Sequence, residues 1–193
     1  MTILSPIAPV AKITPEDLLA MPDGVDYELV DGKLVERNMG YESSVIAVRI
    51  ILLLGVFIKE RDLGHLATTD AGFRCFKDDP GRVRKPDISF VCKGRLPGER
   101  DPKGYCLLVP DLVVEVISPN DRADEVEEKI REYLSAGVPL IWIVHPNTRT
   151  VHIHRPSTSP LGVITRLGES DAITGEDVLP GFSCSVAAFF DQN

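Results

Sequence analysis

Two acidic residues occupy positions where the surrounding residues predict buried β-strands. Glu115 interrupts the run Leu112–Ile117, which is otherwise apolar on both faces and is therefore typical of a central strand. Asp87 follows Pro86 and opens the apolar run Ile88–Val91. Burying an ionised carboxylate without a partner is very costly, so such a residue needs a cation, a proton or a metal.

One cleft can hold both carboxylates if their two strands are paired neighbours. Two carboxylates and a backbone carbonyl can bind Mg²⁺, which prefers oxygen ligands and keeps several waters. A metal in that position polarises a phosphodiester and helps to form hydroxide. For Glu115 alone, a buried salt bridge is slightly the better interpretation. For Asp87 alone, a turn or a cap is slightly the better interpretation. Together with the motifs below, the two acids favour a metal.

The elements that must position these acids follow from the spacing of apolar residues and from turn signals. A helix starts at Thr14 and ends near Met21, and a hairpin turns at Asp31-Gly32. Residues 66–76 predict two short strand-like pieces, and residues 179–182 a turn. Helices are predicted at 42–61 and 119–137, and strands at 83–91, 107–117, 140–144, 150–154 and 162–167.

Length and charge restrict the class of protein. The 193 residues suit one domain, residues 1–193, with a loose N-terminal tail over residues 1–12. A formal net charge of -8 argues against non-specific coating of nucleic acid, which depends on Lys and Arg. It does not exclude a nuclease, because a bound cation inverts the local field. Arg82, Arg84 and Lys85 form one compact basic run, which either faces phosphate or is a solvated strand start.

The chain predicts a cytoplasmic protein without a membrane partner or a nucleotide cofactor. The N-terminal residues lack a charged segment followed by a long apolar stretch, so no signal peptide is apparent. The run Val45–Ile58 is too short to span a bilayer and carries Arg49, which favours a buried helix. The four cysteines lack zinc spacing and suit a reducing compartment. No GxxxxGK[ST] or GxGxxG run is present.

Four segments in a fixed order resemble the Uma-two family of restriction-type endonucleases, within the PD-(D/E)xK superfamily. The resemblance covers the chain from about Thr14 to Phe190. It implies an α/β (α+β) restriction-endonuclease-like core, a mixed central sheet flanked by helices with added hairpins. It also implies Mg²⁺- or Mn²⁺-dependent hydrolysis of DNA. The matching segments are YELVDG at 27–32, KPD at 85–87, PDLVVEVISP at 110–119 and GVPLIWIV at 137–144.

The same resemblance assigns roles to individual residues. Asp87 and Glu115 match the family's metal-binding acids, Glu28 matches an additional acid, and the Val116 carbonyl is a further expected ligand. From the residues alone, Glu28 could equally be a solvated strand residue beside a hairpin. By analogy with restriction enzymes that cut two strands, the protein is also expected to form a homodimer.

One position departs from the superfamily motif. The motif requires Lys two residues after the Glu, where this chain has Ile117. In the family the lysine has moved to the following helix, where Lys129 matches, and its helical phase allows it to reach the sheet. Glu127 lies at the opposite edge by the same phase. Without the family, a surface lysine paired with Glu125 or Glu132 is equally supported.

The sequence leaves two alternative functions open. The missing strand lysine favours a catalytically degenerate member that binds nucleic acid or a protein partner without cleavage. A structural protein with salt-bridged acids is the second rival. His152 and His154 share one strand face, but without a third ligand at suitable spacing they favour an exposed edge strand.

Overall fold

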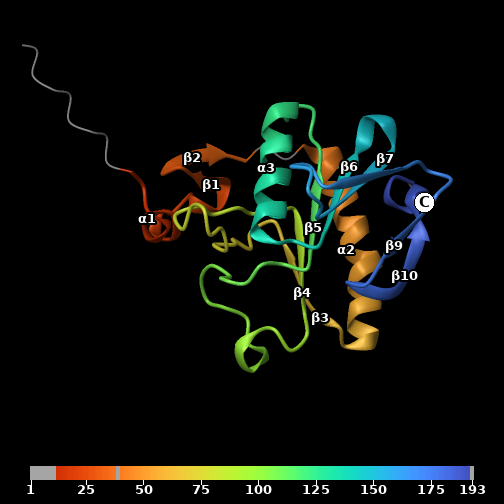
Figure 1. Ribbon diagram of the computed structural model, residues 1–193, viewed down its shortest axis with the longest axis horizontal. Coiled ribbons are helices and arrows are strands. Elements are labelled where there is room, and N and C mark those ends of the chain that lie inside the picture. The colour runs from red at the N-terminus through yellow and green to blue at the C-terminus, as the bar shows by residue number, and fades with distance from the viewer. Residues whose placement is uncertain (1–11, 38–39, 192–193) are drawn as a thin grey trace, which may run out of the picture.

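A mixed β-sheet forms the centre of the computed structural model, which describes residues 12–37 and 40–191 (Figure 1). In these residues six strands form one sheet in the order β3-β4-β5-β6-β7-β8, and β5 and β6 are the parallel pair. This arrangement confirms the expected fold class. The strands are β3 (Gly64–Thr68), β4 (Ile88–Cys92), β5 (Leu112–Val116), β6 (Leu140–His145), β7 (Thr150–Arg155) and β8 (Val163–Leu167).

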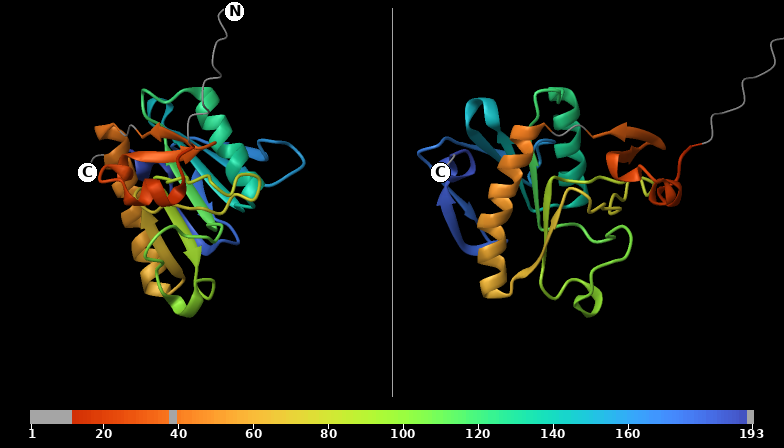
Figure 2. Two further views of the ribbon diagram at one scale, coloured as in Figure 1. Left: turned by 90° about the vertical axis from the view of Figure 1, so that its left-hand side faces the viewer. Right: turned by 180° about the vertical axis from the view of Figure 1, so that it is seen from behind.

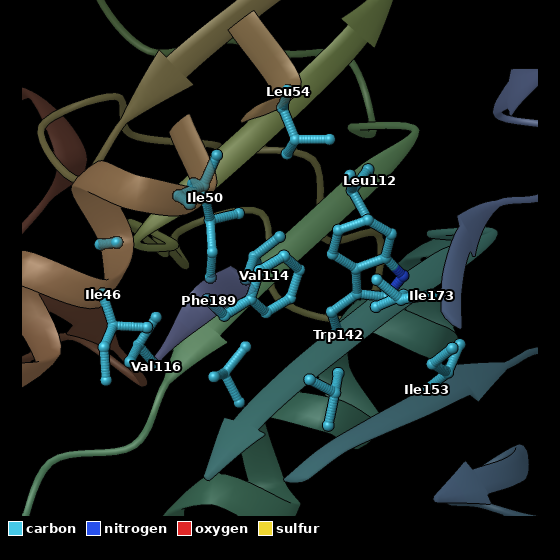
Figure 3. Packing of buried hydrophobic residues seen from close by; sticks show 14 of the residues in the cluster. Ile46, Ile50, Leu54, Leu112, Val114, Val116, Trp142, Ile153, Ile173 and Phe189 are labelled. Atoms are coloured by element: carbon cyan, nitrogen blue, oxygen red, sulfur yellow. The ribbon is translucent and has the colours of Figure 1, made fainter. Parts of the chain in front are cut away.

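The long helix α2 (Tyr41–Arg61) covers one face of the sheet. Alternate side chains of a strand point to opposite faces, so Leu112, Val114 and Val116 of β5 all point toward α2. Trp142 of β6 joins them as a core residue, and Figure 3 shows the packing. The antiparallel pair β9 (Ala172–Gly175) and β10 (Leu179–Ser185) packs against the same apolar core.

Helix α3 (Ala123–Ala136) covers the opposite face (Figure 2). Ile130 and Tyr133 of α3 pack there against Val113 of β5. Glu115 has the same parity as Val113 and therefore lies on the α3 side of the sheet. The hairpin of β1 (Tyr27–Val30) and β2 (Lys33–Glu36) and the helix α1 (Pro15–Ala20) stand beside α3.

Local sequence signals explain the N-terminal elements. The Thr14 side chain accepts a hydrogen bond from the Asp17 N–H, and the Asp17 carboxylate accepts one from the Thr14 N–H, which is a capping box. The hairpin turns through Asp31 and Gly32, both at positive φ. Such a two-residue turn matches the twist of the paired strands. Both elements are as predicted.

Several predicted boundaries are wrong. Pro86 lacks an N–H for a strand ladder, and the strand predicted from residue 83 starts only at Ile88. β5 occupies residues 112–116 of the predicted 107–117, and β3 is the one named strand near residues 66–76. The helix predicted from Pro119 starts at Ala123, because Asp121 accepts a hydrogen bond from the Ser118 N–H in a preceding turn.

The C-terminal part differs more. Residues 179–182, predicted as a turn, belong to β10, which pairs with the unpredicted β9 through a register shift between Leu179 and Ser183. The predicted edge strand carrying His152 and His154 is internal, because β7 pairs with both β6 and β8. His154 is buried, and its Nδ1 lies 2.9 Å from the Leu161 carbonyl oxygen.

Helix α2 is longer than the apolar run that predicted it. Its 21 residues are long and apolar enough to cross a membrane, so the expectation that the segment is too short is wrong. In the structure its Ile46, Ile50, Leu54 and Ile58 belong to the core. These contacts are those of a core helix. That residues 1–193 form a single domain stays a prediction, and residues 1–11 of the expected tail lie outside the described residues.

Candidate active site

Strand pairing brings the two predicted acids together. β4 and β5 are antiparallel with Ile88 opposite Val114, so the same register carries Asp87 to a place beside Glu115. The Asp87 Oδ2 accepts a hydrogen bond of 2.8 Å from the Val116 N–H, which fixes the carboxylate against β5. Val116 itself is buried and lines the site.

A cavity of about 230 Å³ opens over this pair, between the β1–β2 hairpin, the end of β5 and helix α3. Its walls carry carboxylates from several elements together with cations that face some of them. The charged residues that matter here are Glu28, Arg37, Arg84, Asp87, Glu115 and Lys129.

Asp87 and Glu115 have little compensation for their negative charge. Burial, and then the neighbouring Glu115, raises the pKa of Asp87 to about 7. Burial also raises the pKa of Glu115, although Lys129 acts in the opposite direction. The nearest cations form only long ion pairs with them: Arg37 Nη2 lies 3.7 Å from Asp87 Oδ1, and Lys129 Nζ lies 3.9 Å from Glu115 Oε2.

Glu28 is in the opposite situation. Its side chain is 1% exposed, so the alternative of a solvated strand residue is wrong. The Lys85 N–H donates to Oε1 at 2.7 Å, and Arg84 Nη1 lies 2.9 Å from Oε2. Burial would raise the pKa of Glu28, but Lys129 and Arg84 outweigh it and hold the pKa below its usual value.

Lys129 reaches the site from α3. Its Nζ lies 3.3 Å from Glu28 Oε2, in addition to the longer contact with Glu115. The alternative pairing with Glu125 or Glu132 is wrong. Glu132 instead binds Arg84, with Nε 2.5 Å from Oε2. Ile117, the position of the motif's strand lysine, lines the cavity without a charge.

Several residues at the site were not identified from the sequence. The Tyr133 hydroxyl donates to Glu115 Oε1 at 2.8 Å. Lys129, Glu132 and Tyr133 are spaced i, i+3 and i+4, and this spacing is the signal that could have placed all three on one helix face. Arg37 follows β2, and no sequence signal singled it out.

The basic run before Asp87 is not solvated. Arg82, Arg84 and Lys85 are all buried, and Arg84 also lines the cavity. Lys85 Nζ donates to the carbonyl oxygens of Gly24 and Val25 at 2.6 and 3.2 Å. The run therefore holds the fold around the carboxylates.

The donor set fits one hard divalent cation at Asp87 and Glu115. Each carboxylate has one oxygen hydrogen-bonded to the protein and a second oxygen with a cation no nearer than 3.7 Å. Two such oxygens, completed by water, suit Mg²⁺ or Mn²⁺. Across the described parts of the chain, no group of three or more His, Cys, Asp or Glu side chains is arranged to hold a metal ion. Glu28 is thus not grouped with the other two acids as a third side-chain ligand.

Comparisons with known proteins agree with this fold. The profile of the family described as "Uma2: Putative restriction endonuclease" matches residues 15–187, and the chain belongs to that family. A solved structure from Anabaena variabilis ATCC 29413, described as a putative nuclease belonging to DUF820, is 20% identical with a TM-score of 0.76. The match covers 92% of this chain and 97% of that one. No curated protein matches the chain. Family and fold together support a nuclease-like function.

The only partly compensated charge of Asp87 makes the stability of the metal-free protein depend on pH. Below about pH 3 this carboxyl is mostly protonated in both states, and between its ordinary pKa of 3.8 and about 7 only the unfolded chain releases the proton. Rising pH therefore favours unfolding of the wild type. We expect Asp87→Asn to be more stable than the wild type by on the order of 2–4 kcal/mol above pH 7, and equal to it near pH 3.

Urea denaturation in EDTA at a series of pH values measures this difference. Glu127→Gln, an exposed substitution paired only with Arg131, is the control and should follow the wild type at every pH. A wild type that gains stability over Asp87→Asn as pH rises would contradict the charge balance described for the site.

Proposed function

We propose that this Uma2-family protein is a Mg²⁺- or Mn²⁺-dependent endonuclease that hydrolyses DNA phosphodiester bonds. The observation that carries the proposal is the pair of buried carboxylates Asp87 and Glu115, whose charges are only partly compensated, with the Lys129 ammonium beside Glu115. DNA as the substrate rests on the restriction-endonuclease description of the family.

In this proposal Asp87 and Glu115 hold the metal, and the Val116 carbonyl is a further ligand. When bound, the metal acts as a Lewis acid on the phosphodiester and lowers the pKa of a bound water. The protein's own part is to fix the donors. The Val116 N–H orients Asp87, and the Tyr133 hydroxyl orients Glu115, so neither carboxylate must reorganise when the cation arrives.

Lys129 supplies the positive charge that the motif normally places on the strand. Its ammonium donates hydrogen bonds to the attacking water or to a non-bridging phosphate oxygen, where negative charge develops in the transition state. The alternative function, a nuclease fold that binds nucleic acid or a partner without cleavage, is motivated by Ile117 at the strand position. The placement of Lys129 beside Glu115 favours the enzyme.

We also propose that the protein forms a homodimer through α2. Val48, Leu52 and Val56 lie at i, i+4 spacing and are 52%, 61% and 57% exposed, so they form one apolar stripe on the outer face of the helix. The stripe is symmetric about Leu52, so a two-fold axis there pairs Val48 of one copy with Val56 of the other.

The charges of α2 complement one another in the same arrangement. Its first turn carries Glu42 and its last turn carries Lys59 and Arg61. An antiparallel pair of α2 helices therefore sets the acidic start of one beside the basic end of the other, and opposes their dipoles favourably. A second copy of this chain is thus the partner that the stripe fits.

A cytoplasmic location is part of the proposal. Within the described residues the four cysteines form no disulfide, which suits a reducing compartment. Cys106 is buried and the other three are half-buried. Burial raises the pKa of the Cys75 thiol to about 12, so it is unreactive.

Cleavage of supercoiled plasmid and of single-stranded DNA tests the enzyme. With Mg²⁺ or Mn²⁺ we expect nicking by the wild type, and a loss of at least about 100-fold for Asp87→Asn and for Lys129→Met. Glu127→Gln should retain full activity. A well-folded wild type that cleaves no substrate with either metal would move the conclusion to the non-cleaving binder.

Metal binding is testable without any cleavage. A cation that binds the native site raises stability by about 2.7 kcal/mol at one hundred times its Kd, which for this chain length is a rise in Tm of about 5 °C or more. We expect Mn²⁺ to stabilise the wild type and not Asp87→Asn, as measured by thermal unfolding. Equal shifts in both proteins would place the bound metal elsewhere.

Sedimentation velocity over a range of concentrations tests the dimer. Leu52→Lys should shift the protein to monomer, because it buries two like charges on the two-fold axis. Leu107→Lys is a matched control, since Leu107 is also an exposed leucine but lies outside α2. If Leu52→Lys self-associates as strongly as the control, α2 is not the interface.

A further inference from the structure

We infer that Glu28 and Arg84 are positioning residues that hold the Lys129 ammonium at the site, and that Glu28 is not a metal ligand. This rests on the proposed function, whose metal lies at Asp87 and Glu115. It changes the role of Glu28 from the one that the family resemblance implies.

The position of Lys129 creates a need for an anchor. A lysine two residues after Glu115, directly following β5, would be directed by the strand, but that residue is Ile117. Lys129 instead extends from α3 on four flexible carbons, and its side chain is 25% exposed. Holding such a side chain in one place costs rotamer entropy unless a fixed partner binds its end.

Glu28 has the properties of that partner. Its side chain is 1% exposed, and the Lys85 N–H at 2.7 Å fixes its Oε1. The other oxygen, Oε2, is shared by Arg84 Nη1 at 2.9 Å and Lys129 Nζ at 3.3 Å. A divalent cation at Oε2 would have to displace one cation and face the other. Glu28 therefore binds the lysine in place of a metal.

Arg84 is fixed in turn by the helix that carries Lys129. Arg84 Nε donates to Glu132 Oε2 at 2.5 Å, and Glu132 lies three residues after Lys129 on α3. The contacts form a chain of alternating charge, Lys129–Glu28–Arg84–Glu132, and the backbone of α3 between residues 129 and 132 closes it into a ring. Lys129 and Glu132 lie on one turn of α3, so these contacts fix the height of Lys129 above the sheet.

The ring also explains why Lys129 can serve the site. Two cations and two anions cancel within the ring, and Arg82 Nε, 3.2 Å from Glu132 Oε1, extends the pairing. Glu115 lies outside the ring, 3.9 Å from Lys129, so one side of the ammonium still faces the Glu115 carboxylate. The ring therefore fixes the position of the Lys129 ammonium and leaves one side of it free to act at Glu115.

Competitive labelling with an amine-reactive reagent, read by mass spectrometry, tests the anchor directly. We expect Lys129 of the metal-free Glu28→Gln protein to react about tenfold faster than in the wild type, because a charge-assisted contact is lost. Glu127→Gln, the same substitution on the exposed side of α3, should leave the rate unchanged. An unchanged rate in Glu28→Gln would overturn the inference, whether or not the protein cleaves DNA.

The wild type provides the same test if Glu28→Gln does not fold. Lys59 at the exposed end of α2 is the reference. In the native chain Lys129 should react at least about tenfold more slowly than Lys59, and in urea the two rates should converge. Equal rates in the native chain would show that no anchor holds Lys129.

Metal affinity separates positioning from ligation. Direct Mn²⁺ binding, followed by electron paramagnetic resonance, should be lost in Asp87→Asn and stay within about threefold of the wild type in Glu28→Gln. Equal loss in both variants would make Glu28 a ligand and overturn the inference. Absence of Mn²⁺ binding and cleavage in the wild type would instead reject the proposed function, and the labelling would still decide the anchor.

A double-mutant cycle tests whether Glu28 acts through Lys129. At saturating metal, cleavage by Glu28→Gln should fall at least about tenfold, and the double variant with Lys129→Met should be no slower than Lys129→Met alone. A merely structural Glu28 would make the two losses multiply, and that result would overturn the positioning role.

Discussion

A buried negative charge must be compensated, and the site meets this requirement in two different ways. Glu28 is compensated by the protein itself, through Arg84, Lys129 and a backbone N–H. Asp87 and Glu115 are also buried, but their nearest cations lie 3.7 Å or more away. Glu28 therefore has a structural role, whereas Asp87 and Glu115 can still bind a cation.

The scaffold is arranged around that division. The α2 face of the sheet is apolar, and Ile50, Val114 and Trp142 pack there in the main core. The α3 face carries the charges, because strand alternation sends Glu115 to the side opposite Val114. One helix then supplies both a hydroxyl for Glu115 and the ammonium beside it. Packing on the apolar face holds the strands together, and their pairing places the charged side chains on the opposite face.

Family and fold support a nuclease-like protein, but they leave the individual roles open. The solved relative is 20% identical, so it shows the shared fold and nothing finer. The loss of the strand lysine at Ile117 changes how the site must be built. A lysine on a helix needs an anchor outside its own element, and the buried ring through Glu28 and Arg84 has the geometry for it.

By itself the sequence determined the family, the mixed sheet and the main positions of interest. Glu115 inside an apolar strand and Asp87 after Pro86 are local patterns, and the capping box at Thr14 and the Asp31-Gly32 turn depend on neighbours in the chain. Only the tertiary structure decided what surrounds each charge. The partners of Glu28 come from residues 84, 85 and 129, and burial of Arg84 depends on packing that no local pattern encodes. The pairing of β9 with β10 escaped prediction likewise, because its register shift breaks the period-two pattern. Periodicity reports which face a residue occupies, whereas compensation of a charge depends on distance in space between segments far apart in the chain.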